Sequence, residues 1–262
     1  MAILIPRKKE FWQKAPVNPE VDWNKDLAKG LSCLFIQEDP HPRNIVDSED
    51  ATIYGVYRLS AETHGDRLMA DFASAAQRIE LPAIECSSSE ATIFTTINPW
   101  ILNTDHNISF KLLAQNTYLS IYQGKVFAKW RTANHFGLTT HSAGESKQIA
   151  ATLSGGISTL YSGGIFDSTN SDSATLSASS AVRLGKFGTI WNSSLDFRGA
   201  MGVTGFYSRA LSDEEIAEVD HNPYQILKPR RKYWALPVAG VQAPSVVRLL
   251  NLRKSLRSLL TR

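Results

Sequence analysis

The chain has 262 residues, of which 43% are hydrophobic and 20% are charged, and its formal net charge is +3. This composition supports a folded core of ordinary size and excludes a disordered, collagen-like or disulfide-dense protein. The length fits one large β-domain with extensions, since all-β sandwiches of about 200–250 residues often form a single unit. No apolar run approaches the roughly 18 residues that a membrane-spanning helix needs.

The N-terminal residues predict an extended arm. Residues 1–21 contain a short apolar start, the basic run Arg7–Lys9 and three prolines, and they show no periodic core face. The apolar stretch precedes the basic run, which is the reverse of the order in a secretory signal peptide. We therefore expect a protein made in the cytoplasm and not exported by that route.

The middle of the chain, from about Asn24 to Arg209, has the composition of a β-domain. Short runs rich in β-branched and aromatic residues predict strands at 91–97, 118–122, 125–130 and 181–184. Gln123-Gly124 predicts a hairpin turn between the second and third of these strands. A second hairpin is expected around Ser162–Gly164, between residues 159–161 and 165–166. Turn signals recur at the spacing of about 8–12 residues that is typical of a sandwich.

Two segments depart from the β pattern. Residues 64–78 place apolar side chains near helical spacing, which predicts a short helix or an irregular excursion. The segment 212–219 predicts a helix with Ser212 as its N-cap and Glu215 as the returning carboxylate of a capping box. Pro223 follows shortly after it and ends the helical pattern.

The last 42 residues form a separate basic element. From His221 to Arg262 there are nine Lys and Arg residues and no acidic residue, whereas the first 220 residues, with 19 basic and 25 acidic residues, carry a net charge of −6. The spacing of apolar residues within 245–260 predicts a terminal helix with arginines at the rims of its apolar stripe. Such an element suits an acidic partner, but the sign of the charge does not distinguish a partner-binding tail from a solvated extension.

Two stretches at opposite ends of the β region resemble the laminin-G-like, concanavalin A-like jelly-roll domains that are common in bacteriophage and prophage proteins. In residues 197–216, a glycine-containing strand is followed by Tyr207-Ser-Arg-Ala-Leu-Ser and an acidic helix start, which resembles the closing pattern of this family. Asn222-Pro-Tyr224 resembles the Asn-Pro-aromatic sequence that often follows this closing pattern in phage members of the family. Residues 21–36, with Leu27-Ala-Lys-Gly-Leu31, resemble the opening turn and first strand. The Ser-Gly-Gly turn at 162–164 departs from the family's usual Asp-Gly or Asn-Gly.

The resemblance implies an all-β fold: a two-sheet antiparallel jelly-roll sandwich of the concanavalin A-like type, with one short helix near 212–219 and extended terminal arms. We therefore expect an N-terminal arm over 1–21, a jelly roll over 22–224 and a basic C-terminal arm over 225–262. Independently of the resemblance, placing the first and last strands side by side lets such a sandwich bury its apolar faces. Phe206 and Leu211 would then pack inward, and Arg209 would bind backbone carbonyls or a carboxylate at the end of the sheet.

The sequence lacks the patterns of common catalytic and metal sites. No strand carries the alternating acids that a glycoside hydrolase on a jelly roll uses, and there is no Gly-x-Ser-x-Gly elbow or phosphate-binding glycine loop. The histidines include no His-x-x-x-His pair, and Cys33 and Cys86 form no Cys-x-x-Cys pattern. We expect buried free thiols, no zinc site and no catalytic residue, with a glycoside hydrolase left as a minor alternative.

Two binding sites remain open alternatives to ordinary structural roles. Members of the resembled family hold calcium with loop aspartates. The oxygen-rich segment from Asp167 to Asp172 begins and ends with an aspartate, and it forms either a Ca²⁺ site or a plain polar loop. Trp100, Trp130 and Trp191 are the largest rings of the β region, and they form either core contacts or a platform for a sugar face. No other cofactor is expected.

The main functional hypothesis is a structural bacteriophage virion protein, most simply a head decoration or minor capsid protein that attaches through its arms. Its partners would be the major capsid protein, other virion proteins or neighbouring copies in a homo-oligomer, with nucleic acid and membranes disfavoured. The arm residues expected to bind these partners are Phe11, Trp12, Arg230, Arg231, Lys232, Tyr233, Trp234, Arg248, Leu249, Leu252, Arg253, Leu256 and Arg257. The alternative is a carbohydrate-binding module of a tail fibre or spike that binds a host glycan.

Overall fold

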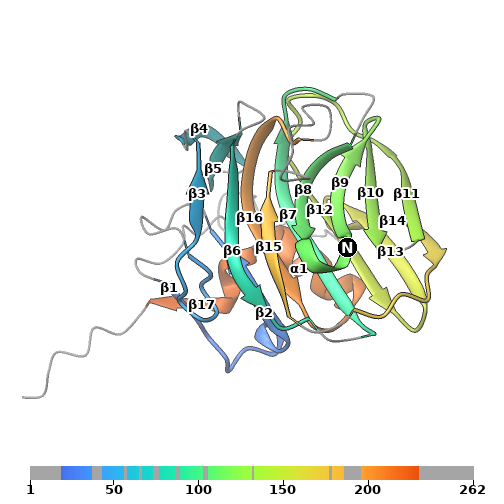
Figure 1. The fold of residues 1–262 in the computed structure, drawn as a ribbon, viewed down its shortest axis with the longest axis horizontal. Coiled ribbons are helices and arrows are strands. Elements are labelled where there is room, and N and C mark those ends of the chain that lie inside the picture. The colour runs from blue at the N-terminus through green and yellow to red at the C-terminus, as the bar shows by residue number, and fades with distance from the viewer. Residues whose placement is uncertain are drawn as a thin grey trace, which may run out of the picture. The chain divides into compact units, whose positions relative to one another are not determined.

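A computed structural model of the protein describes residues 19–36, 43–55, 58–64, 67–72, 77–86, 89–102, 106–131, 133–176, 179–185 and 196–229. These residues form two large antiparallel sheets, as expected for a jelly-roll sandwich (Figure 1), and a third sheet of two short strands. The predicted terminal helix at 245–260 and all the predicted partner-binding residues of the arms lie outside the described residues. None of the helices in the described part of the chain has the length and apolar character needed to cross a membrane.

The first sheet has seven strands. Their spatial order is β11 (Ala133–Thr140), β10 (Lys125–Trp130), β9 (Thr117–Tyr122), β8 (His106–Leu112), β15 (Ser180–Leu184), β6 (Arg78–Ile84) and β3 (Thr52–Tyr54). The predicted hairpin between 118–122 and 125–130 is confirmed as β9 and β10. Gln123 and Gly124 have φ values of 49° and 77°, the left-handed pair that a tight hairpin turn requires.

The second sheet has eight strands. Seven follow in the order β14 (Ile165–Ser171), β13 (Ile157–Ser162), β12 (Lys147–Ser154), β7 (Ala91–Pro99), β16 (Gly199–Tyr207), β5 (Arg67–Phe72) and β4 (Arg58–His64), and β2 (Leu31–Phe35) also pairs with β16. The pairing of β2 with β16 confirms that the first and last strands of the jelly roll lie side by side. All residues of β7 and β16 are buried, as expected of central strands covered on both faces.

The predicted helix or excursion over 64–78 is wrong. This part of the chain contains the end of β4, the whole of β5 and the start of β6. Strand β5 pairs with β4 on one side and β16 on the other, and Met69, Ala70 and Phe72 are all buried. Because both faces of this strand are covered, its apolar residues do not alternate, and their spacing imitated that of a helix.

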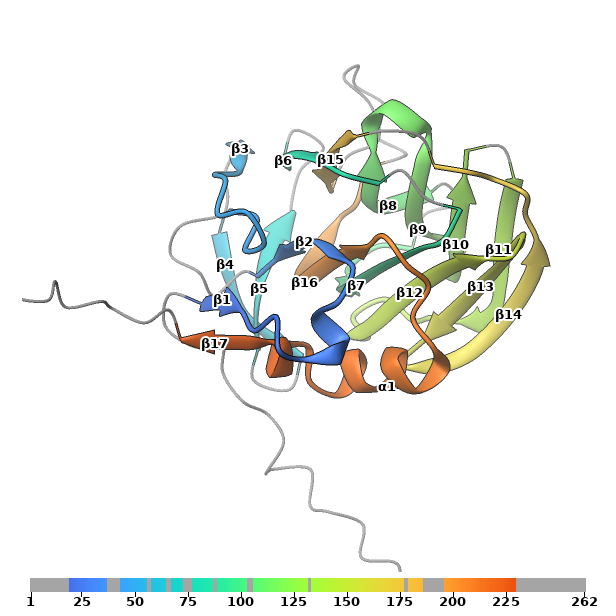
Figure 2. The ribbon, with the colours of Figure 1, turned by 90° about the horizontal axis from the view of Figure 1, so that it is seen from below.

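The molecule has three layers (Figure 2). The main core lies between the sheets and includes Phe72, Phe110, Trp130, Phe197 and Phe206. A second apolar cluster lies on the outer face of the eight-stranded sheet, where it is covered by α1 (Asp213–His221) and the 3-10 helices η2 (Asp26–Ala28) and η4 (Pro223–Ile226). A further 3-10 turn, η3 (Leu113–Gln115), joins β8 to β9. Cys33 and Cys86 are buried free thiols, as predicted.

Helix α1 begins with the predicted capping box. The Ser212 hydroxyl accepts a hydrogen bond from the Glu215 backbone N–H, and the Glu215 carboxylate accepts one from the Ser212 N–H. Phe206 and Leu211 are buried, also as predicted. Arg209 donates from Nε to the Lys29 carbonyl (2.7 Å) and binds both oxygens of Glu215 (2.7 Å each). Arg209 therefore holds η2 and α1 together over the sheet.

The two ends of the described chain meet in a small sheet of their own. Strand β1 (Pro19–Val21) pairs antiparallel with β17 (Leu227–Pro229), and Pro19 lies opposite Pro229. The body therefore extends a few residues beyond the expected limits of 22 and 224. Residues 230–262 lie outside the described residues.

The Arg209 contacts predict a measurable loss of stability. Replacing Arg209 with Leu removes charge-assisted hydrogen bonds to Glu215 and Lys29, and we expect the free energy of unfolding to fall by about 2 kcal/mol in urea titrations. The control is Lys29→Ala, because the Lys29–Asp26 ion pair is exposed and its loss should leave the unfolding midpoint nearly unchanged. Equal effects of the two substitutions would contradict the assigned role of Arg209.

Candidate functional site

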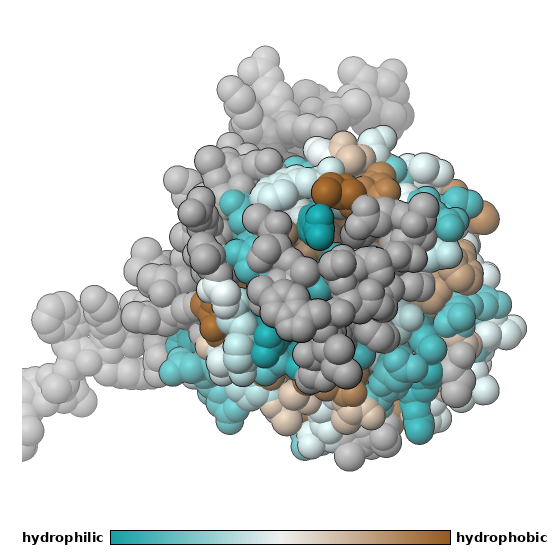
Figure 3. All heavy atoms as spheres, turned by 45° about the horizontal axis from the view of Figure 1, so that its top comes forward, coloured by the Kyte–Doolittle hydropathy of each residue, from teal (hydrophilic) through white to brown (hydrophobic). Residues whose placement is uncertain are grey.

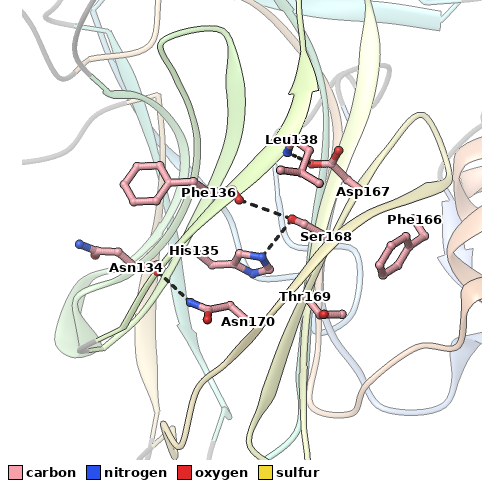
Figure 4. A pocket seen from close by; sticks show the side chains of 9 residues that line it. All are labelled: Asn134, His135, Phe136, Leu138, Phe166, Asp167, Ser168, Thr169 and Asn170. Atoms are coloured by element: carbon pink, nitrogen blue, oxygen red, sulfur yellow. Dashed lines mark hydrogen bonds between the residues drawn. The ribbon is translucent and has the colours of Figure 1, made fainter.

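A groove runs between the free edges of the two sheets. Strand β11 is the last strand of the seven-stranded sheet, β14 is the last strand of the eight-stranded sheet, and they lie next to each other (Figure 4). The groove has a volume of about 530 Å³. It is lined by Asn134, His135, Phe136, Leu138, Phe166, Asp167, Ser168, Thr169 and Asn170.

Side chains of β14 close this side of the sandwich. A bulge in the β13–β14 pairing places Asp167 so that its carboxylate accepts hydrogen bonds from the backbone N–H groups of Leu138 (2.9 Å) and Thr139 (2.8 Å) and from the Thr139 hydroxyl (2.5 Å). Asn170 donates to the Asn134 carbonyl at 3.2 Å. These bonds satisfy backbone groups that an edge strand otherwise leaves open to another chain.

Gly137 allows the close approach of the two edges. A Cβ atom at this position would overlap the Asp167 carboxylate and would lie 3.1 Å from the Val126 carbonyl oxygen. Position 137 therefore has no room for a side chain while Asp167 binds the amides of β11.

A buried hydrogen-bond network lies behind the groove. Ser158 accepts a hydrogen bond from Trp130 Nε1 (3.0 Å) and contacts His135 Nδ1 (2.9 Å), while His135 Nε2 lies 3.0 Å from the Ser168 hydroxyl. Burial lowers the pKa of His135 below its ordinary value of 6.5, and the nearby Asp167 carboxylate opposes this effect. The neutral imidazole thus joins the two sheets through two serine hydroxyls.

Large apolar side chains are exposed around the groove. Phe136 is 47% exposed and Leu138 71% exposed on β11, while Ile165 and Phe166 on β14 are 72% and 54% exposed. The rings of Phe136 and Phe166 point away from each other, one on each flank of the groove (Figure 4). The coloured residues of the face in Figure 3 form a mosaic of hydrophilic and hydrophobic side chains. Exposed apolar groups gathered in one place commonly mark a binding surface.

The predicted tryptophan platform is not formed by Trp130. This side chain is fully buried between the sheets, so it is a core residue and cannot stack on a sugar. Trp100 is partly buried just after β7, and its backbone N–H donates to the Arg198 carbonyl. Trp191 lies outside the described residues.

The two predicted calcium ligands are held in different ways. Asp167 binds the amides of β11, as described above. Asp172 lies just beyond β14, its Oδ1 atom accepts a hydrogen bond from the Ala174 N–H (2.9 Å), and burial raises its pKa. Within the described ranges, no group of three or more His, Cys, Asp or Glu side chains is placed to hold a metal ion.

Of the groove residues, only Asp167 was among the candidates from the sequence, as a calcium ligand. Side chains of a strand point alternately to its two faces. In β11 this alternation leaves one set exposed, namely Asn134, Phe136 and Leu138, and buries His135 and Gly137. That alternation in the sequence could have predicted β11 and its exposed residues. Strand β11 and its phenylalanine were not predicted, because tryptophan was taken as the candidate sugar-stacking residue.

Comparisons with known proteins identify the fold. No protein-family model and no curated protein matches the sequence. Among solved structures, domain 4 of AbnA, an extracellular arabinanase from Geobacillus stearothermophilus, in complex with arabinotriose, has a TM-score of 0.55 and 17% identity over 72% of this chain and 98% of that domain.

Toxin binding domains are also similar. The binding domain of Paraclostridial Mosquitocidal Protein 1 has a TM-score of 0.59 and 14% identity over 76% of this chain and 53% of that one. The ligand-binding domain of botulinum neurotoxin serotype D, in complex with N-acetylneuraminic acid, has a TM-score of 0.57 and 11% identity over 73% and 50% of the two chains. The chain therefore spans about half of these toxin domains. At such identities the shared property is the jelly-roll sandwich.

The Asp167 bridge is testable by a nearly isosteric change. Asp167→Asn turns one acceptor oxygen into a donor, which leaves a donor of β11 without a partner and is expected to lower the free energy of unfolding by about 1–3 kcal/mol. Ser171→Ala, an exposed change on the same strand, is the control and should stay within about 0.5 kcal/mol. Urea unfolding measures both changes, and an unaltered midpoint for Asp167→Asn would contradict the bridge.

Proposed function

We propose that this domain is a glycan-binding module whose site is the groove between β11 and β14. The observation that carries the proposal is the pair of exposed rings, Phe136 and Phe166, beside the exposed polar side chains of Asn134, Thr169 and Asn170. The C–H face of a sugar packs on an aromatic ring, while amide and hydroxyl groups bond to sugar hydroxyls. The groove offers both kinds of contact.

The solved structures support a binding role of this kind. One similar domain contains arabinotriose and another contains N-acetylneuraminic acid. Those ligands belong to proteins of low identity, so they indicate a class of ligand and no particular sugar. For this chain, the side chains of its own groove support the proposal.

The proposed activity is binding without hydrolysis. Glycoside hydrolysis in its usual form needs two carboxyl groups about 5–9.5 Å apart on either side of the scissile bond. The residues that line the groove include one carboxylate, Asp167, and its oxygens already accept three hydrogen bonds. Asp167 therefore has a structural role in the edge of the sandwich.

Loss of either exposed ring should weaken glycan binding. Phe136→Ala and Phe166→Ala each remove a stacking surface, and we expect Kd for the best glycan on an array to rise about tenfold, or about 1.4 kcal/mol. Trp23→Ala is the matched control, since Trp23 is an exposed aromatic residue in the N-terminal segment beside η2. Calorimetry with folded variants measures Kd, and unchanged binding by both Phe variants would refute this site.

A second candidate function, attachment to a phage particle through the arms, is favoured by the position of the chain ends. Because Pro19 lies opposite Pro229, residues 1–18 and 230–262 join the body at one place. Strands β1 and β17 lie at one end of the body, and β11 and β14 lie at the other (Figures 1 and 2). A body anchored at β1 and β17 would present its groove outward, so this role is compatible with glycan binding.

Removal of the C-terminal arm separates the two functions. If the arms attach the protein to a particle, deletion of residues 230–262 should abolish co-sedimentation with phage particles, while glycan binding by the folded body persists. The Phe136→Ala variant should show the reverse pattern, with attachment retained and glycan binding weakened. Co-sedimentation of the truncated protein at the level of the full chain would exclude attachment through this arm.

A further inference from the structure

We propose that the glycan is acidic and that its anionic groups bind lysines on the outer face of the seven-stranded sheet, next to the groove. The proposal rests on the glycan-binding function and names the chemical class of the ligand. It follows from the register of the strands, the position of the aromatic rings and the distribution of charge on this face.

The strand register aligns polar side chains across the sheet. Residues directly opposite one another on paired strands project from the same face. The row that runs from β6 to β11 consists of Glu80, Arg183, Lys111, Tyr118, Lys129 and Asn134. Asn134 also lines the groove, so this basic row leads into the proposed glycan site.

The row lies on the outer face of the sheet. Leu119, Ile121 and Val126, which alternate with its residues on β9 and β10, belong to the core between the sheets. Tyr118 and Phe127 form a separate cluster with Tyr122. This separation places the rings and the lysines on the side opposite the core.

Aromatic rings connect the row to the groove. The Tyr118 and Phe127 ring centroids are 5.6 Å apart, and the Phe127 and Phe136 centroids are 4.7 Å apart. Tyr122 lies 5.7 Å from Phe136. Sugar rings that pack on Phe136 and Tyr122 would therefore have Lys129 on one side and Lys125 on the other, since these lysines flank Phe127 on β10.

Positive charge is concentrated on this face. Lys111, Lys125 and Lys129 project from it, and the Glu80 carboxylate is shared by two guanidinium groups, those of Arg78 (3.0 Å) and Arg183 (2.6 Å). Burial lowers the pKa of Lys111, and the charges of Arg183 and Lys129 lower it further. The first 220 residues carry a net charge of −6, so this basic face is a local feature. An anion placed between the lysines would reduce their mutual repulsion.

The number and spacing of the cations favour an acidic glycan over nucleic acid. Lys111 and Lys129 lie two strands apart, which corresponds to about 9.6 Å at the usual strand separation. This distance is comparable with the separation of acidic groups on alternate sugars of an extended glycan chain. Nucleic-acid binding commonly uses about six to ten phosphate contacts. Three lysines, with Arg183 buried against Glu80, are few for that purpose.

The test compares matched acidic and neutral glycans. Pectic or sialylated oligosaccharides are measured beside the same molecules with their carboxyl groups reduced, at about 50 and 200 mM salt. We expect the acidic form to bind at least about tenfold more tightly at low salt, and the double variant Lys111→Gln/Lys129→Gln to abolish this preference while retaining affinity for the neutral form. Lys125→Gln, which changes an exposed lysine of the same face, is a second variant and should also weaken the preference for the acidic form. The control is Lys25→Gln, which lies before η2 on the covered side of the other sheet.

The outcomes separate this proposal from the function on which it rests. Equal binding of acidic and neutral forms, or a preference that survives all the lysine substitutions, overturns the acidic class and leaves glycan binding intact. Failure of every glycan to bind overturns the proposed function itself. Tighter lysine-dependent binding of a single-stranded oligonucleotide or of vesicles containing anionic lipid would also overturn the proposal.

Discussion

The burial of the eight-stranded sheet on both faces determines where the rest of the molecule can bind a ligand. One face packs against the seven-stranded sheet, and α1, η2 and η4 cover the apolar part of the other face. Arg209 holds part of that covering layer through Glu215 and the Lys29 carbonyl. On the described body, exposed side chains such as Phe136, Phe166 and Lys125 remain at the β11–β14 edge and on the nearby part of the seven-stranded sheet, where a ligand can reach them.

Closure of the β11–β14 edge divides the nearby polar residues into two groups. Those that point inward, such as Asp167 and His135, exchange hydrogen bonds between the sheets and stabilise the fold. Those that point outward, such as Asn134, stand beside exposed rings. Residue types that suggest a metal site or catalysis in the sequence, such as Asp167 and His135, thus make structural hydrogen bonds. The proposed glycan contacts come from alternate positions of the same strands.

Jelly-roll sandwiches have many different functions, so the shared fold does not identify the function of this chain. The separation of the chain ends from the groove makes glycan binding and attachment through the arms compatible within one molecule. The lysine row joins the groove at Asn134, and the proposed preference for an acidic glycan depends on this junction. The chain ends, the groove and the lysine row can each be tested by a different substitution or deletion.

The sequence by itself determined the features that depend on neighbouring residues. These include the β9–β10 hairpin with its left-handed turn and the capping box of α1. The resemblance at the two ends of the β region predicted the sandwich, and the burial of its apolar faces separately favoured the adjacent first and last strands, which are β2 and β16. Only the tertiary structure showed that Arg67–Phe72 is a strand, that Trp130 is in the core, and that Asp167 bridges to β11. Strand pairing and sheet contacts join residues far apart in the chain, so local spacing carries no record of them. The groove and the lysine row depend on these long-range pairings for the same reason.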